Sequence, residues 1–190
     1  DQLKKVTEVT MEMSAQSGVM LNAKDIQEGI GKISKANMLT AGMNTKEMTK
    51  QVVQAKLLGV SQSQLASIGD SLLDFEGSIA AEMEAELLTG KQLNLENARA
   101  AALAGDQAAL AAELRKEVGT IAEFEGMNVM QREAMAKAFG MNIDQMAEML
   151  NKQAEMEAMQ KATDGAYSSQ SEAQEAFNKL VEDGMSAEQA

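Results

Sequence analysis

A short motif recurs along this chain: glycine, an apolar residue, Asn or Ser, and then Glu or Gln three positions later. The copies are Gly42-Met43-Asn44 with Glu47, Gly59-Val60-Ser61 with Gln64, Gly140-Met141-Asn142 with Gln145, and Gly184-Met185-Ser186 with Gln189. The glycine can end one helix in a left-handed conformation, and the Asn or Ser can cap the next helix. The Glu or Gln can return a hydrogen bond to the capping residue. The motif therefore predicts one helix after another, joined by tight corners.

The positions of these caps and corners follow from the motif. We expect N-caps at Asn44, Ser61 and Asn142, each contributing about 1 kcal/mol to stability. The apolar residue before each cap is expected to pack against the residue four positions past the cap: Met43 on Met48, Val60 on Leu65, and Met141 on Met146. We expect corners at six glycines: Gly42, Gly59, Gly90, Gly119, Gly126 and Gly140.

The composition favours helices and no strands. The chain has no Pro, only 3% aromatic residues and 16 Met, so Ala, aliphatic residues and flexible Met must form its core. No run of residues alternates between apolar and polar as a half-buried strand does. The sequence thus predicts an all-α fold. We expect a multi-helix array of short capped helices with tight glycine corners, flanked by longer amphipathic, coiled-coil-like helices.

The helical pattern divides the chain into three regions. We expect amphipathic helices over 1–58, a compact helical block over 59–150, and C-terminal helices over 151–190. The expected helices with two defined ends cover 1–17, 44–58, 61–88, 94–104, 106–118 and 128–139. Another helix starts at Asn22 and is either continuous or interrupted at Gly29 and Gly31. We also expect a turn from Thr120, a long helix from Asn142, and a last helix with Phe177 and Leu180. Because the chain starts within an amphipathic pattern and stops four residues past Ser186, we interpret it as a segment of a longer parent chain.

The expected helix over 61–88 carries an apolar seam. Its residues are Leu65, Ile68, Leu72, Phe75 and Ile79, continued by Met83. The first five are spaced by three and four positions, which is typical of a coiled coil. We expect the seam to be buried, either within the chain or against identical copies on a symmetry axis. If Phe75 is fully buried, Phe75→Ala should cost about 3–5 kcal/mol. Gly69 and Gly77 are the places where this helix would bend or break.

The charge of the chain limits its partners. The net charge is −12, which disfavours binding to nucleic acid or to anionic lipid. Arg99, Arg115 and Arg132 are far apart and form no basic stripe of the kind that reads nucleic acid. No apolar run approaches the length of a membrane span. We therefore expect no sequence-specific nucleic-acid partner and no membrane partner.

The sequence offers little for catalysis or metal binding. It contains no His and no Cys, and no phosphate loop, nucleophile elbow or calcium loop. Two clusters are acidic: Glu82, Glu84 and Glu86, and Glu148, Glu155 and Glu157. Helical residues two apart point to different faces, so solvated faces are favoured over metal sites. For Asp70 and Asp74, simple exposure or a cap at Asp70 is favoured over a catalytic carboxylate pair. For the methionines from Met127 to Met159, helix packing is favoured over an adaptable partner groove. We expect no enzyme activity, cofactor or metal.

Several strings of the chain resemble a known family. They are LGVS (58–61), LLDFEGSI (72–79), EMEAELLTGK (82–91), LNLENAR (93–99), AGD (104–106) and MNVMQREAMAKAFGM (127–141). Together, over roughly 51–150, they resemble a helical block of the tail tape-measure and related virion proteins of marine tailed bacteriophages. None of these strings is a catalytic motif.

The resemblance implies a long, mostly helical virion protein inside the tail tube, which sets tail length and leaves ahead of the DNA. It implies several identical copies on the tail axis, contacts with tail-tube and baseplate hub proteins, and assembly in the host cytoplasm. A pure ruler should be a continuous heptad repeat, whereas short helices with tight corners favour a folded plug or tip module. The acidic faces around 82–86 and 148–157 should then meet water or basic partner groups. A helical scaffold or adaptor module of a cellular protein remains the alternative.

Overall fold

The structure is a computed structural model that describes residues 2–33 and 44–164, and these residues form ten helices and no strand. The helices are α1 (Gln2–Ser17), α2 (Ala23–Gly31), α4 (Thr45–Leu58), α5 (Gln62–Leu73), α6 (Phe75–Thr89), α7 (Glu96–Ala104), α8 (Gln107–Glu117), α9 (Ile121–Gly126), α10 (Val129–Ala138) and α11 (Ile143–Asp164). The all-α fold is thus confirmed for the described residues. The predicted corner at Gly42, the staple from Met43, the last copy of the motif (184–189) and the helix with Phe177 and Leu180 lie outside them.

Glycines in the left-handed region stand at many of the corners. In the described ranges, those with positive φ are Gly18, Gly59, Gly90, Gly105, Gly119 and Gly140. Gly59 needs to be glycine for two reasons: its φ is 93°, and a Cβ there would lie 2.7 Å from the carbonyl oxygen of Met149 on α11. Gly126 differs, because it is the last residue of α9 and the chain turns at Met127, whose backbone is extended. The corner predicted at Gly126 therefore forms one residue later, at Met127, and without a glycine in the left-handed conformation.

Side-chain caps begin most of these helices. The Asn44 side chain accepts a hydrogen bond from the Glu47 N–H at 3.1 Å. At Ser61 and Asn142 the bond is reciprocal, because the Gln three positions later also accepts from the N–H of the capping residue. The same box forms at Thr120 with Glu123 and at Asn128 with Gln131. Each cap satisfies backbone N–H groups that the first turn of a helix leaves without partners.

The single helix predicted over 61–88 is wrong, because the chain breaks at Asp74 into α5 and α6. Asp74 has ψ of 80°, which is not helical, and its carboxylate accepts from the Gly77 N–H at 3.3 Å. Asp stabilises helix starts and competes with the helical backbone inside a helix. The break is therefore at Asp74, while Gly69 and Gly77 both remain helical.

The structure also settles whether the second helix is continuous and where the helix before Gly105 begins. The second helix is not interrupted at Gly29, and a Cβ at this position would lie 2.4 Å from the Cγ1 atom of Val52. Gly29 thus allows α2 to approach α4 closely. The helix predicted over 94–104 begins later, at Glu96, because 90–95 forms a non-helical connection between α6 and α7.

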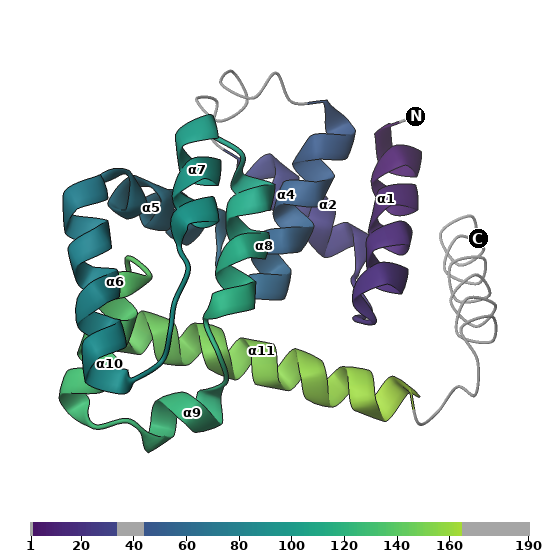
Figure 1. Cartoon of the computed structure of the whole chain (residues 1–190). Coiled ribbons are helices and arrows are strands. Elements are labelled where there is room, and N and C mark those ends of the chain that lie inside the picture. Colours follow the sequence, from purple (N-terminus) through teal and green to yellow (C-terminus); the bar gives the residue numbers. More distant parts are fainter. Residues whose placement is uncertain (1, 34–43, 165–190) are drawn as a thin grey trace.

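Helix α4 contributes to both hydrophobic clusters of the molecule. The smaller cluster joins α4 to the N-terminal helices: Val6, Leu21, Ile26, Ile33, Val52, Val53 and Leu57. The larger cluster joins α4–α11, with Ala55 and Leu58 contributed by α4. In Figure 1, α1 and α2 lie on one side of α4 and α8 lies on the other. The predicted boundary after Leu58 therefore falls at the end of a helix that packs in both directions.

Helices α6 and α10 form the end of the array that lies farthest from α1 (Figure 1). They run antiparallel, because the Gln131 side chain at the start of α10 donates to the Leu88 carbonyl at the end of α6. Helix α11 starts beside α10 and runs along the array toward α1. Within the described part of the chain, no helix is long and apolar enough to cross a membrane.

Candidate functional site

The inner face of α6 is fixed against the rest of the molecule. Ser78, Ala81, Glu82 and Ala85 are buried on this face. The small Ala side chains permit close packing of α6 on α10, whose Ala134 and Ala138 are also buried. The opposite face of α6 is consequently directed away from the array.

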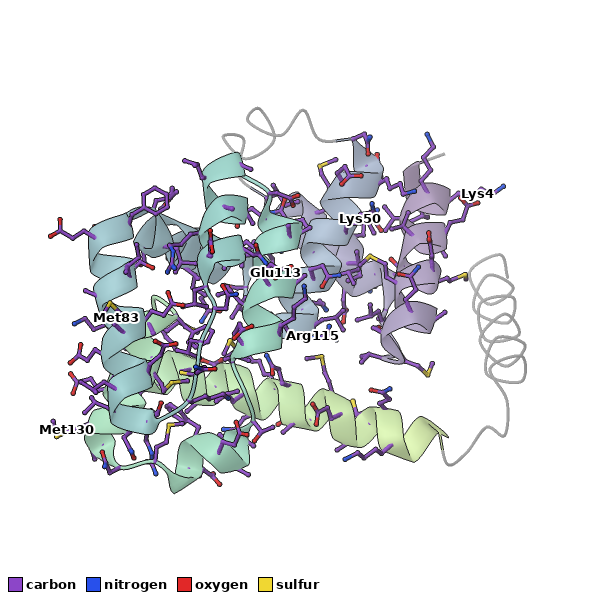
Figure 2. All side chains as sticks on the ribbon, viewed as in Figure 1. Lys4, Lys50, Met83, Glu113, Arg115 and Met130 are labelled. Atoms are coloured by element: carbon purple, nitrogen blue, oxygen red, sulfur yellow. The ribbon has the colours of Figure 1, made fainter. Side chains whose placement is uncertain are left out.

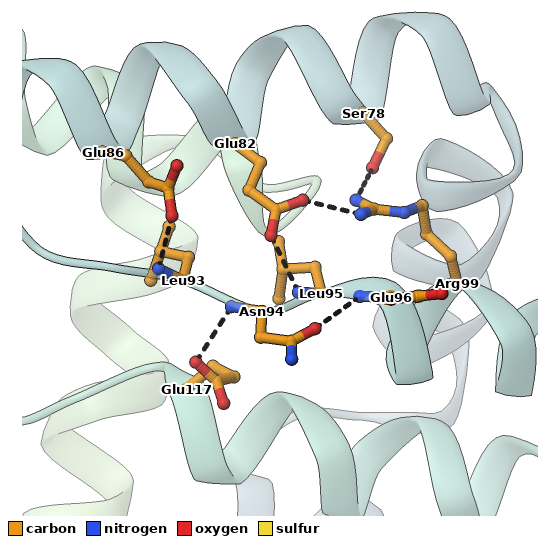
Figure 3. Close-up of polar contacts among 9 residues, drawn as sticks. All are labelled: Ser78, Glu82, Glu86, Leu93, Asn94, Leu95, Glu96, Arg99 and Glu117. Atoms are coloured by element: carbon orange, nitrogen blue, oxygen red, sulfur yellow. Dashed lines mark hydrogen bonds and ion pairs between the residues drawn. The ribbon is translucent and has the colours of Figure 1, made fainter.

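Glu82 links this inner face to the connection before α7 (Figure 3). One carboxylate oxygen accepts from the Leu95 N–H at 2.9 Å, and the other pairs with the Arg99 guanidinium at 2.7 Å. Arg99 also donates to the Ser78 hydroxyl at 3.2 Å. The Glu82 and Arg99 side chains are each only 11% exposed, so this charge pair is largely removed from water.

Two further carboxylates hold the neighbouring backbone. Glu86 accepts from the Leu93 N–H at 2.8 Å, and Glu117 on α8 accepts from the Asn94 N–H at 3.2 Å (Figure 3). Three consecutive backbone donors of a non-helical segment are thus each bonded to a carboxylate. Hydrogen bonds with one charged partner are stronger than those between neutral groups. The predicted solvated acidic face is therefore wrong for Glu82 and Glu86, and holds for the exposed Glu84.

The predicted apolar seam is divided by the break at Asp74. On α5, Leu65, Ile68 and Leu72 lie in the larger hydrophobic cluster and are at most 1% exposed. On α6, the apolar side chains face outward instead: Phe75 is 43% exposed, Ile79 44%, Met83 63% and Leu87 86%. We call these four residues the α6 outer stripe. Of the two expected alternatives, burial of the whole seam within the chain does not occur, because the corner at Asp74 turns its second half out of the core. Burial of that half against identical copies stays a prediction.

The outer stripe extends onto the neighbouring helix. Val129 and Met130, in the first turn of α10, are 68% and 67% exposed. The first turn of α10 lies beside the end of α6, since the Gln131 side chain is bonded to the Leu88 carbonyl. Met83 and Met130 project from the same end of the molecule (Figure 2). The two helices therefore present apolar side chains together at this end.

The charged groups around the outer stripe are mainly acidic. Glu76 and Glu84 on α6, and Glu133 on α10, are all exposed. Glu84 pairs with Lys137 at 3.4 Å, whereas no described residue forms an ion pair with Glu76 or Glu133. The site thus combines an apolar stripe with carboxylates that have no partner within the described chain.

The other residues singled out from the sequence are exposed, cap a helix or pack in the core. Asp70 is an exposed residue within α5 and does not cap a helix, while Asp74 caps α6. Among the methionines, Met135, Met146 and Met149 are buried in the larger cluster. The alternative of helix packing therefore holds for these three. The sequence did not reveal the role of Glu82 and Glu86, although their spacing of four positions places them on one helix face.

A shallow hollow of about 340 Å³ opens beside the corner between α5 and α6. Ser71, Asp74, Ser78 and Lys137 contribute its polar groups. The Ser71 hydroxyl donates to the Ser67 carbonyl, and the Ser78 hydroxyl accepts from Arg99, so both hydroxyls already have partners. Among the described residues, no group of three or more Asp and Glu could hold a metal ion. The outer stripe of α6 is thus a stronger candidate than this hollow.

The outer stripe therefore places exposed apolar side chains on a helix whose opposite face is anchored by Glu82 and Glu86. No protein-family model, curated protein sequence or solved structure matches this chain.

Proposed function

We propose that this chain is a structural, non-catalytic segment of a bacteriophage tail protein of the tape-measure kind, which acts by packing against other chains. The observation that carries the proposal is the α6 outer stripe. Large apolar side chains exposed along an entire helix face are typical of a surface that a partner covers. The chain would lie in the tail lumen of the virion after assembly in the host cytoplasm.

The proposed partners are identical copies of the chain on the tail axis and the tail-tube and baseplate hub proteins. The acidic charge supports this location, since a chain of net charge −12 does not hold DNA that must pass through the same narrow tube. We propose neither a sequence-specific nucleic-acid partner nor a membrane partner in the assembled state.

The packing of α4–α11 supports a folded plug or tip module more than a ruler. A ruler requires helices that continue end to end, whereas α5 and α6 form a corner and α10 returns antiparallel to α6. The strings that carry the resemblance lie on these packed helices. We therefore propose that the chain occupies the tail, contacts its partners through the outer stripe, and is released ahead of the DNA.

Mass spectrometry of purified phage particles tests this proposal. Peptides of the parent chain should be present in DNA-filled particles and lost from tails after ejection is triggered, while tube-protein peptides remain in both samples. Absence of the parent chain from filled particles would contradict the proposal. Recovery in a stable cellular complex would instead support the alternative, a helical scaffold or adaptor module, which the same exposed stripe could serve.

A further inference from the structure

We infer that the α6 outer stripe binds an amphipathic helix of a different chain, whose own apolar stripe is flanked by Lys or Arg. This inference rests on the proposed function, in which α6 is an assembly surface, and it specifies the partner. The stripe is apolar from end to end and a second copy of this chain could also cover it. The charges around the stripe distinguish between these two occupants.

The dimensions of the stripe fit a helix. Phe75 and Leu87 are twelve positions apart, which corresponds to roughly 18 Å along a helix axis. The residues of the stripe recur every four positions, so a partner helix of three to four turns can follow them with side chains placed between theirs. Apolar anchors at successive turns are the usual means by which one helix recognises another surface.

The acidic surroundings favour a basic partner. Glu76 follows Phe75 on α6, and Glu133 lies on α10 one turn before Lys137, which pairs with Glu84 of α6. Neither Glu76 nor Glu133 has an ion-pair partner in the described chain. Residues 59–164 contain 18 Asp and Glu but only 8 Lys and Arg. A partner with Lys or Arg beside its apolar stripe would place positive charge within about 8 Å of these carboxylates, where salt screens the attraction incompletely.

A second copy lacks this complementarity. Two α6 faces in contact would bring one acidic region against another, and like charges at an interface oppose association. The N-terminal helices of a second copy do not supply a basic face either, because residues 2–33 contain four Lys and four Asp or Glu. Helix α4 contains three Lys and one Glu, but its Val and Leu side chains are buried within the chain: Val52, Val53, Leu57 and Leu58. The described helices therefore present no strongly basic apolar face to the stripe of another copy.

A designed peptide tests the inference. The probe is a labelled 14-residue peptide of Leu and Lys, arranged as a helix with one apolar face. Its binding to the 190-residue chain is measured by fluorescence anisotropy at physiological salt. We expect Ile79→Ser with Met83→Ser to weaken binding by about tenfold or more, because central apolar contacts dominate such interfaces. Glu76→Gln with Glu133→Gln should weaken binding by roughly threefold to tenfold, since exposed charge pairs contribute less.

Matched variants on other faces provide the controls. Leu103→Ser changes a side chain on α7 that is 68% exposed, and Glu155→Gln with Glu157→Gln removes two exposed carboxylates from α11. Both should leave the affinity for the peptide unchanged. A Leu and Glu peptide of the same pattern should not bind. Circular dichroism must show that every variant retains its helix content. No binding of the Leu and Lys peptide, or equal weakening by all variants, would overturn the inference.

Sedimentation without peptide separates this inference from the proposed function. If the chain alone forms dimers that Ile79→Ser with Met83→Ser dissociates, the partner of the stripe is a second copy. That result overturns the inference but supports α6 as an assembly surface. If the stripe variants change neither peptide binding nor self-association, α6 is not an assembly surface, and the proposed function loses its main support as well.

Discussion

At the residue scale, the buried ion pair of Glu82 and Arg99 is the interaction whose loss should destabilise the fold most by electrostatics. Both side chains are largely buried, and the same carboxylate also accepts the Leu95 N–H. A buried pair has a high desolvation cost, so its presence adds little stability by itself. Removal of one partner is different, because it leaves the other charge buried without compensation.

Arg99→Ala should therefore lower the free energy of unfolding by about 3 kcal/mol. Lys137→Ala, which removes the partner of the exposed Glu84, should lower it by less than about 1 kcal/mol. Urea denaturation of the two variants and the parent measures both values. Similar losses for the two variants would show that the burial of the Arg99 pair does not matter for stability.

The corner between α8 and α9 makes a pH-dependent contribution to the stability of the fold. A hydrogen bond from Lys91, then one from the Thr120 backbone N–H, and then the Lys91 charge lower the pKa of Glu123 below its ordinary value of 4.5. In the unfolded chain the pKa returns to the ordinary value. The folded state thus binds this proton less readily, and the stabilisation is present above pH 4.5 and is lost as pH falls through the lower folded pKa.

Glu123→Gln should consequently destabilise the chain at about pH 6 and have less effect at about pH 3, where the carboxylate is increasingly protonated. Urea denaturation of the variant and the parent at both pH values measures the difference. The effect should be small, because the ion pair with Lys91 is exposed. Glu125→Gln, at an exposed position on the same helix, is the control. A constant difference between the Glu123 variant and the parent at both pH values would contradict the assignment.

Residue-scale reasoning from sequence works where the interaction is local. The caps at Ser61 and Asn142 involve a Gln three positions away, so their spacing already indicates the bond. Glu82 accepts from a backbone group thirteen residues away, and Glu117 from one that is 23 residues away. No pattern along one helix contains that information, and this is why the solvated-face interpretation failed for Glu82 and Glu86.

At the element scale, Asp74 separates two helices that the apolar spacing joins. The interval pattern of the seam continues through Asp74, and the sequence therefore predicts one helix. The structure ends α5 at Leu73 and starts α6 at Phe75, with Asp74 capping the second helix. Apolar spacing reports helix phase but not whether the core continues in the same direction. The exposure of Phe75 and Ile79 after the corner could not be predicted from it.

Asp74→Ala should reduce the free energy of unfolding by about 1 kcal/mol, because the first turn of α6 loses its acceptor. Asp74→Asn keeps a carbonyl oxygen at the same place and should change the value by only a few tenths of a kcal/mol. Thermal or urea unfolding of both variants provides the measurement. Equal losses from Ala and Asn would mean that the hydrogen bond to Gly77 does not stabilise the start of α6.

At the scale of the whole molecule, α4 joins two hydrophobic clusters, and α6 with α10 closes the end farthest from α1 (Figure 1). Composition and spacing were sufficient for the all-α class, since a chain without Pro and with repeated caps has few alternatives. They could not decide which helix faces outward, because this depends on packing between α6, α10 and the 90–95 connection. The α6 outer stripe is therefore a feature of the assembled fold.

Methionine oxidation tests the central claim, that a partner covers the α6 outer stripe in the assembled tail. Met83 is 63% exposed in the chain, and Met20, at the α1 end, is 58% exposed. With dilute peroxide, both should oxidise at similar rates in the isolated chain. In purified tails that contain the parent chain, we predict that Met83 oxidises at least about tenfold more slowly, since a covered side chain is withdrawn from the oxidant. Met20 should lose less of its reactivity. Oxidation of Met83 in tails at the rate of the isolated chain would show that the stripe remains uncovered and would contradict the account.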